Sequence, residues 1–190
     1  MQCALVLGSA HTKEYAKDKK VGIIMHQRSS HLQDALFNNV LGLVPGTLGK
    51  DILEEGRNQL KQQYPEVSQI DNEKVMAVLE EENGYRIVTN KNEYHSKNVV
   101  IALNYTKPFD IAGLEQYVER HIRANVMKDR IQLRNFNHLI REGLYVCGTL
   151  AGWRSQFAIA AGSGASVATD ILTVWNENVP TKVHDKHKKD

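Results

Sequence analysis

The sequence predicts an α/β fold, and three observations lead to that prediction. A short apolar run, Leu144–Cys147, indicates a buried strand, which ends at Gly148-Thr149. Apolar residues then recur at helical spacing from Phe157 to Trp175. Small residues over Ala161–Gly164 allow a second backbone to approach this helix closely. A strand that leads through a glycine turn into such a helix forms an α/β crevice.

The start of this helix is the first candidate binding site. The amides around Gln156–Ile159 point out of the helix end and carry partial positive charge, so they suit an electron-rich ligand edge such as a flavin carbonyl. Gln156, Phe157 and Ala158 are therefore candidate cofactor-binding residues. The alternative is a strand and a helix that pack a core and hold no ligand.

The chain begins with another helix and strand. Gln2–Lys17 has the pattern of an amphipathic helix that closes with lysines, and Val21–Met25 has the pattern of a buried strand. His26 and Gln27 follow this strand. They either hydrogen-bond a ribose hydroxyl or are ordinary polar loop residues.

The middle of the chain predicts a loop, two helices and a series of short strands. A turn at Pro45-Gly46 lies in the loop Asn38–Thr47, which leads into a helix over Asp51–Tyr64. Asn83-Gly84 is a hairpin signal. A second helix is expected from Ile111 to about Asn125, followed by polar connectors. Strands are expected over Glu66–Ile70, Lys74–Glu81, Gly84–Thr89, Glu93–His95 and Asn98–Leu103.

Composition narrows the classes of partner. A chain of 190 residues with 42% hydrophobic content can bury one core. The net charge of +2 comes partly from the lysines after residue 181, so no basic groove for nucleic acid is expected. No uninterrupted apolar run reaches the roughly 18 residues of a membrane span, and the first residues do not resemble a signal peptide.

The cysteines and histidines form no recognisable reactive array. Cys3 and Cys147 make neither a CxxC pair nor a disulfide framework, which fits a reducing, cytoplasmic location. We expect Cys147 to be a small core residue. None of the eight histidines has a carboxylate or cysteine at a telling spacing, so no metal site is predicted and no catalytic residue is assigned.

The closing strand and helix resemble those of the FAD domain of pyridine-nucleotide-disulfide oxidoreductases, the thioredoxin-reductase-like flavoproteins. In that family a G-D dipeptide follows the strand, and an A-x-x-x-G-x-x-A-A helix comes next. Gly148 matches the glycine, while Thr149 stands where the family has an aspartate that binds the flavin ribityl chain. The strand at Asn98–Leu103 is similar to the family's V-I-I-A-T-G, and Ala102 matches its alanine. Leu103-Asn104 places bulk where the family has a close-approach glycine.

The resemblance covers Gln2 to Trp175. It implies a Rossmann-like FAD/NAD(P)-binding domain with a small β-meander over residues 1–175. The composition of residues 176–190, rich in lysine, separately predicts a flexible polar tail. The resemblance also implies FAD as the cofactor, an unidentified electron donor or acceptor, and a homo-oligomer as one arrangement. The cofactor-binding positions that follow from it and from the helix start are His26, Gln27, Pro45, Gly46, Val75, Ala102, Gly148, Thr149, Gln156, Phe157 and Ala158.

Four parts of the full-length reductases have no counterpart in this sequence: the first strand, the glycine loop, the NAD(P)H domain and the redox dithiol. The resemblance places Met1 immediately after the glycine loop G-x-G-x-x-G, so an incomplete N-terminus is expected. The first strand of the fold would lie between Val21–Met25 and Leu144–Cys147. The NAD(P)H domain and the redox dithiol are also absent, since only about 40 residues separate Leu103 from Leu144.

The sequence supports two functional hypotheses. The first is an FAD-dependent oxidoreductase-like protein of the thioredoxin reductase type, without an NAD(P)H domain or dithiol. The second is a non-catalytic binding or interaction module that kept the fold and lost the cofactor. Thr149 and Leu103-Asn104 favour the second, as does the missing glycine loop.

Overall fold

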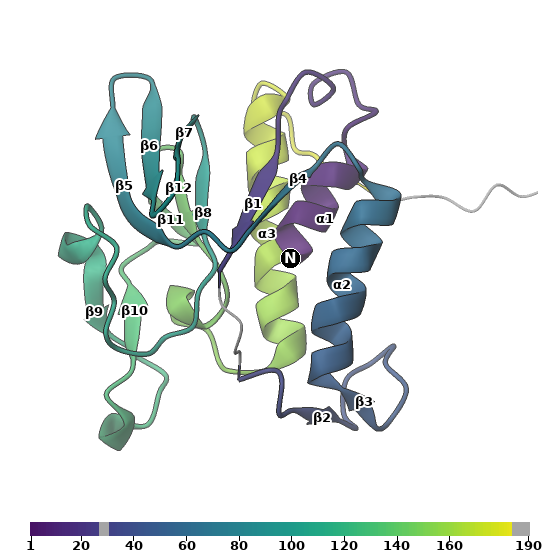
Figure 1. Ribbon diagram of the computed structural model, residues 1–190, viewed down its shortest axis with the longest axis vertical. Helices are drawn as coiled ribbons and strands as arrows, with labels where there is room; N and C mark the ends of the chain where they lie inside the picture. The colour runs from purple at the N-terminus through teal and green to yellow at the C-terminus, as the bar shows by residue number, and fades with distance from the viewer. Residues whose placement is uncertain (27–30, 184–190) are drawn as a thin grey trace, which may run out of the picture.

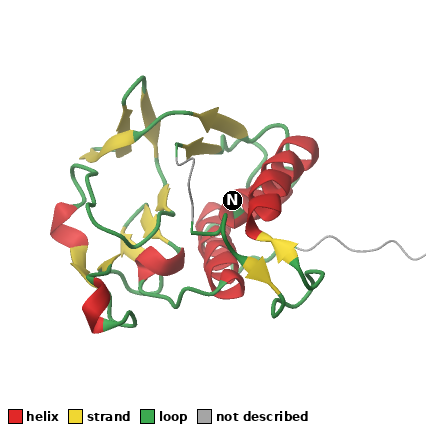
Figure 2. Ribbon diagram, turned by 60° about the horizontal axis from the view of Figure 1, so that its bottom comes forward, coloured by secondary structure: helices red, strands yellow, loops and turns green. Residues whose placement is uncertain are grey.

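The computed structural model describes residues 1–26 and 31–183, so the predictions for Gln27 and for the last seven residues of the polar tail fall outside the described residues. The α-helices lie on one side of the molecule with the hairpin over residues 36–48, and the strands within residues 75–146 lie on the other (Figures 1 and 2). The helices α1 (Gln2–Ser9), α2 (Gly49–Gln63) and α3 (Phe157–Trp175) stand side by side. The α/β class predicted from the sequence is confirmed.

The parallel strands form two separate sheets. In the first, β1 (Gly22–Met25) pairs with β4 (Ser68–Asp71), and Ile23 lies opposite Gln69. In the second, β12 (Leu144–Val146) lies between β8 (Val99–Ile101) and β11 (Leu139–Arg141), parallel to β8 and antiparallel to β11. The strands expected at Val21–Met25 and Leu144–Cys147 are present.

The position expected for the missing first strand is wrong, because β12 has a partner on both edges. The open edges belong to β1 and β8, which lie beside each other in Figure 1. Val21 and Val100 pack into one core cluster, and Ile24 packs against a second cluster that contains Ile101. Backbone hydrogen bonding is therefore interrupted between β1 and β8, while side chains in and just before β1 pack in the same core clusters as those of β8.

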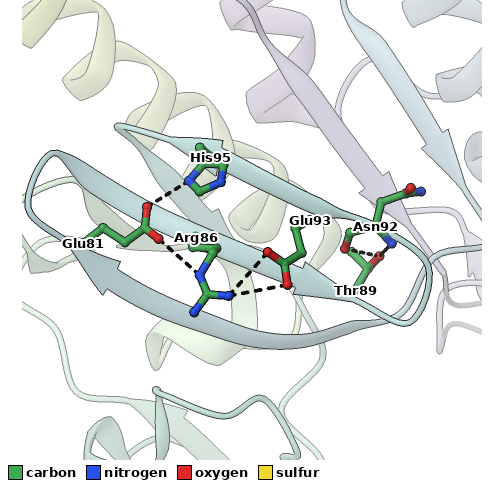
Figure 3. Close-up of polar contacts among 6 residues, drawn as sticks. All are labelled: Glu81, Arg86, Thr89, Asn92, Glu93 and His95. Carbon is green, nitrogen blue, oxygen red and sulfur yellow. Dashed lines mark hydrogen bonds and ion pairs between the residues drawn. The ribbon is translucent and has the colours of Figure 1, made fainter.

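A three-stranded antiparallel meander covers the second side of the molecule. It consists of β5 (Val75–Glu81), β6 (Gly84–Thr89) and β7 (Glu93–Ser96), and the hairpin turn falls at the predicted Asn-Gly position. Its solvent face carries a chain of ion pairs (Figure 3). Arg86 lies 3.1 Å from Glu81 and 3.4 Å from Glu93, and His95 Nδ1 lies 2.8 Å from Glu81. Exposed pairs of this kind add little stability.

Two predicted helices differ from the structure. The first helix ends at Ser9, where the Ser9 hydroxyl bonds back to the carbonyl of Val6, and the chain continues to Asp18 in turns. Apolar residues at helical spacing stop near Ala10, and the charged segment that follows contributes only Tyr15 and Ala16 to the core, from turns. The prediction of a helix over Gln2–Lys17 is therefore too long by two turns.

The helix expected from Ile111 to Asn125 is absent. Gly113 has φ +87°, which breaks the helical path. There is no room for a side chain at this position, because an added Cβ would lie 2.2 Å from the carbonyl oxygen of Val78. The segment instead forms the short η1 (Glu115–Tyr117) and β9 (Val118–Arg120), which pairs with β10 (Ile131–Leu133). The stretch predicted as polar connectors supplies β10 and β11. The short η2 (Val126–Lys128) lies between β9 and β10.

Helix α3 is the centre of the helical side. Its buried residues pack with Leu7, Ala10 and the sheet residue Tyr145. Gly164 meets α1 so closely that a Cβ there would lie 3.2 Å from the backbone nitrogen of Cys3. By length and composition α3 is apolar enough to cross a membrane, but the core helix of a soluble protein meets the same test. After α3, the backbone N–H of Thr181 donates to the Thr173 hydroxyl (3.2 Å).

Candidate functional site

The candidate site lies where parallel strands end. In Figure 1, β1, β8 and β12 run towards the side of the molecule where α3 begins. Ligands of open α/β sheets bind outside the carboxyl ends of the strands. His26 follows β1, Ala102 follows β8, and Gly148 follows β12 after Cys147. The backbone N–H of Cys147 donates to the carbonyl of Ile101 (3.0 Å), which holds the ends of β8 and β12 together.

Gly148 provides the turn that leads out of β12. Its φ is +73°, a value that favours glycine, and the nearest atom to an added Cβ would be the Ala160 Cβ at 4.0 Å. Its N–H donates to Ser163 Oγ on α3 (2.8 Å). The turn is therefore tied to the helix, and space remains open beside its Cα.

The start of α3 offers free donors. Gln156 is the N-cap residue and its side chain does not cap the helix. The first intrahelical bond runs from the N–H of Ala160 to the carbonyl of Gln156 (2.9 Å). The N–H groups of Phe157, Ala158 and Ile159 therefore have no intrahelical acceptor, as at every helix N-terminus, and carry partial positive charge.

Thr149 is held through its backbone by residues that the sequence did not single out. Its carbonyl accepts a hydrogen bond from Nε2 of His121 (3.0 Å), and His121 Nδ1 accepts from the N–H of Arg123 (3.1 Å). Arg123 in turn donates from Nη1 to the carbonyl of Gly152 (2.8 Å). These residues come from the segment predicted as a helix and its connector. No motif marks them, so only the fold brings them to η3 (Gly148–Ala151).

The hairpin of β2 (Leu36–Phe37) and β3 (Thr47–Leu48) borders the site on the side of α2. Its loop contains Pro45 and Gly46, both exposed, and Gly46 has φ +92°. Phe37 packs against Phe157 at the start of α3, with ring centroids 5.2 Å apart. The structure therefore brings this hairpin to the start of α3.

The remaining predicted positions are distributed along the strand ends. His26 and Ala102 are exposed, and Val75 is half-buried at the first position of β5. Val75 follows β4 after the turn at Asn72, whose N–H donates to the carbonyl of Met25. The structure thus places these residues near the ends of β1, β4 and β8. It contains no ligand contact that assigns them a role.

The two thiols belong to the core. Cys147 is buried, and Cys3 packs against the same cluster although 144 positions separate them. Burial raises the pKa of Cys3 to about 12, with a further contribution from Cys147, and burial also raises the pKa of Cys147. Both stay protonated at neutral pH, so neither is activated as a nucleophile. Within the described residues, no group of three His, Cys, Asp or Glu side chains could hold a metal ion.

Parallel strands whose carboxyl ends meet an uncapped helix start define the class of Rossmann-like nucleotide-binding folds. Solved structures place the chain within that class more narrowly. It is similar to a ferredoxin-flavin thioredoxin reductase from Clostridium acetobutylicum, with 14% identity and a TM-score of 0.65 over 93% of this chain and 94% of that one. It is also similar to the atypical thioredoxin reductase TRi from Desulfovibrio vulgaris Hildenborough, with 12% identity and a TM-score of 0.66 over 95% and 96%.

A third similar structure is an oxidoreductase from Agrobacterium tumefaciens, with 12% identity and a TM-score of 0.66 over 93% of both chains. No family model matches the sequence. No curated protein matches it either. The chain therefore has the thioredoxin-reductase-like fold expected from its motifs. At these identities the likeness establishes the fold alone.

Proposed function

We propose that this protein is a flavin-binding, oxidoreductase-like domain of the thioredoxin reductase type, and that its cofactor is FAD. The observation that supports the proposal most directly is the meeting of a positive-φ Gly148 turn with the uncapped start of α3, at the carboxyl ends of β8 and β12. The domain would comprise residues 1–175 and act in the cytoplasm.

The chain's own groups suit the flavin end of FAD. The amides of Phe157, Ala158 and Ile159 are free to donate to the electron-rich edge of the ring, and the helix dipole stabilises negative charge there. The open space at Gly148 admits the cofactor close to the backbone. Thr149 stands at the ribityl position, where its hydroxyl can bond a neutral sugar-alcohol chain without a charge. FAD, when bound, supplies the electron-carrying chemistry.

Electron transfer would need partners outside the described residues. Cys147 is buried and Cys3 is half-buried against the same core, and burial raises the pKa of both thiols, so the chain offers no reactive dithiol to exchange with a disulfide. A separate donor must therefore reduce the flavin, and a separate acceptor must oxidise it. The similar structure from Clostridium acetobutylicum is a ferredoxin-flavin thioredoxin reductase, which makes a one-electron protein donor a class to test first.

The first experiment is equilibrium dialysis of the purified protein against FAD, followed by absorbance of the retained flavin. Stoichiometric retention supports the flavoprotein. A folded protein that retains no FAD at saturating concentration contradicts the proposal and supports the alternative of an interaction module without cofactor. Leu103, 42% exposed just beyond β8, favours that alternative because it places a bulky residue at the carboxyl end of this strand.

Ala158→Pro tests the position of the flavin. Proline is tolerated in the first turn of a helix, so the fold should survive, but the Ala158 N–H is lost. We expect FAD affinity to fall about tenfold, since a hydrogen bond to a charge-bearing group contributes roughly 1.5–3 kcal/mol. Ala158→Ser keeps the N–H and serves as the matched control. Equal FAD affinity in the proline and serine variants would contradict this placement.

A further inference from the structure

A second site lies on the other side of the β12–α3 connection, at the turn that leads into β11. Phe136 and Leu139 exchange two backbone hydrogen bonds of 2.9 Å, so Asn137 and His138 form a two-residue hairpin turn. Both have positive φ, 45° and 74°, as a type I′ turn requires. Asparagine and glycine adopt this backbone most easily. A histidine at the second position is a strained choice, and such strain often accompanies a binding role.

His138 is buried, with 6% of its surface exposed, and hydrogen-bonding contacts at Nδ1 fix the orientation of its ring. Nδ1 lies 3.1 Å from the carbonyl oxygen of Val146 and 3.4 Å from Ser163 Oγ. A carbonyl only accepts, so Nδ1 carries the hydrogen and Nε2 of the neutral ring keeps a free lone pair. No described residue bonds Nε2. Among the described residues, Arg130 Nε is the only side-chain nitrogen or oxygen that is both buried and without a hydrogen-bond partner. Nε2 of His138 also lacks a partner, so it is not a buried atom and is accessible from outside.

The access leads through a hollow of about 240 Å³ beside α3. None of its lining residues carries a formal charge when the imidazole is neutral: they are His138, Trp153, Ile159, Gly162, Ser163 and Ser166. The two rings lie with centroids 5.8 Å apart at 35°. Gly162 leaves the floor open, since an added Cβ would meet nothing within 4 Å.

We propose that this hollow binds a small, neutral, planar ring that donates an N–H to Nε2 of His138 and packs against Trp153. The absence of charged walls disfavours ions, because a charge moved there would lose water without gaining a counterion. The planar shape follows from the aromatic walls. The donor follows from the lone pair of Nε2, which has no partner among the described residues and accepts a hydrogen bond from a ring N–H that enters the hollow. The site does not depend on the proposed flavin.

The test compares indole with benzofuran, which has the same shape but an oxygen in place of the N–H. Titrations of the full chain without FAD, followed by ligand-observed saturation-transfer NMR, give both affinities. We expect indole to bind about five- to tenfold more tightly, as one satisfied buried hydrogen bond predicts. Equal affinities, or no binding of indole, would overturn the proposal.

Two variants separate the hollow from the fold. Gly162→Leu fills the floor and should abolish indole binding, whereas Val174→Leu, at an exposed position of α3 outside the hollow, should leave it unchanged. His138→Asn suits the positive φ, and its amide N–H can replace Nδ1 at Val146. It should reduce indole binding to the level of benzofuran. Indole binding that persists undiminished in Gly162→Leu, with a native melting curve, would place the ligand elsewhere and refute the site.

Discussion

Glu73 shows at the scale of a single residue how hydrogen bonds can hold a buried carboxylate. It is 6% exposed, and its carboxylate accepts hydrogen bonds from the Thr89 hydroxyl (2.7 Å), the Asn92 amide (2.7 Å) and the Tyr94 hydroxyl (3.0 Å). The Thr89 bond is the main cause that lowers the pKa of Glu73, and the other two bonds add to it, while burial opposes the shift. These bonds join the turn before β5 to β6 and β7.

We expect Glu73→Gln to lower the melting temperature at neutral pH. The new NH2 group would face the hydroxyl and amide groups of Thr89, Asn92 and Tyr94, which now donate hydrogen bonds to the carboxylate. The folded pKa of Glu73 lies below the unfolded value of about 4.3, so its contribution is fully present above that value and disappears as pH falls through the folded pKa. The difference between variant and wild type should therefore shrink in acid. Thermal melts across this range measure it, with the exposed Glu82→Gln as control. A difference that is independent of pH would contradict the assignment.

At the scale of an element, two glycines of α3 have opposite surroundings. Gly162 faces open space, so Gly162→Ala should stabilise the protein by about 0.5–1 kcal/mol through the better helix propensity of alanine. Gly164 faces α1, where a methyl would lie 3.2 Å from the Cys3 nitrogen and 3.5 Å from Gln2 Cβ. Gly164→Ala should cost about 1–3 kcal/mol by overpacking.

The two alanine variants are each other's control, because they make the same chemical change two positions apart. Their melting temperatures should move in opposite directions, by about 2–4 °C for each kcal/mol. If Gly164→Ala were as stable as Gly162→Ala, the close packing of α1 against α3 would be wrong.

At the scale of the whole molecule, the interruption between β1 and β8 should be visible in hydrogen exchange. The N–H and C=O of one strand residue point to the same edge, and those of the next residue point to the other edge. Val21 and Met25 accept from β4 and its following turn, so Gly22 and Ile24 face away from it. Val100 likewise faces away from β12, because Val99 and Ile101 bond towards it.

We therefore expect the amides of Gly22, Ile24 and Val100 to exchange much faster than those of Ile23 and Ile101, whose ladder bonds protect them. Residue-resolved exchange by NMR measures both groups in one sample, and the ladder amides are the internal control. Equal protection at all five positions would show that another segment pairs with the open edges.

The sequence by itself determined the elements with a clear local pattern. The apolar run at Leu144–Cys147, the helical spacing after Phe157 and the Asn83-Gly84 turn predicted β12, α3 and the β5–β6 hairpin, because each depends on residues within one or two turns of chain. The family motifs gave the thioredoxin-reductase-like fold for the same reason. The cofactor residues read from those motifs stay predictions.

The tertiary structure decided what local pattern could not. The helix predicted after Ile111 became β9 and η1, since Gly113 must take a positive φ where Val78 crosses it. Pairing of β8 with β12, 45 positions apart in the sequence, leaves the open sheet edge on β8 and not on β12. His121 at Thr149 and His138 in its hollow carry no sequence motif, because their environment comes from segments far apart in the chain. Contacts of that range depend on packing and on backbone pairing, and neither leaves a periodic signal in the sequence.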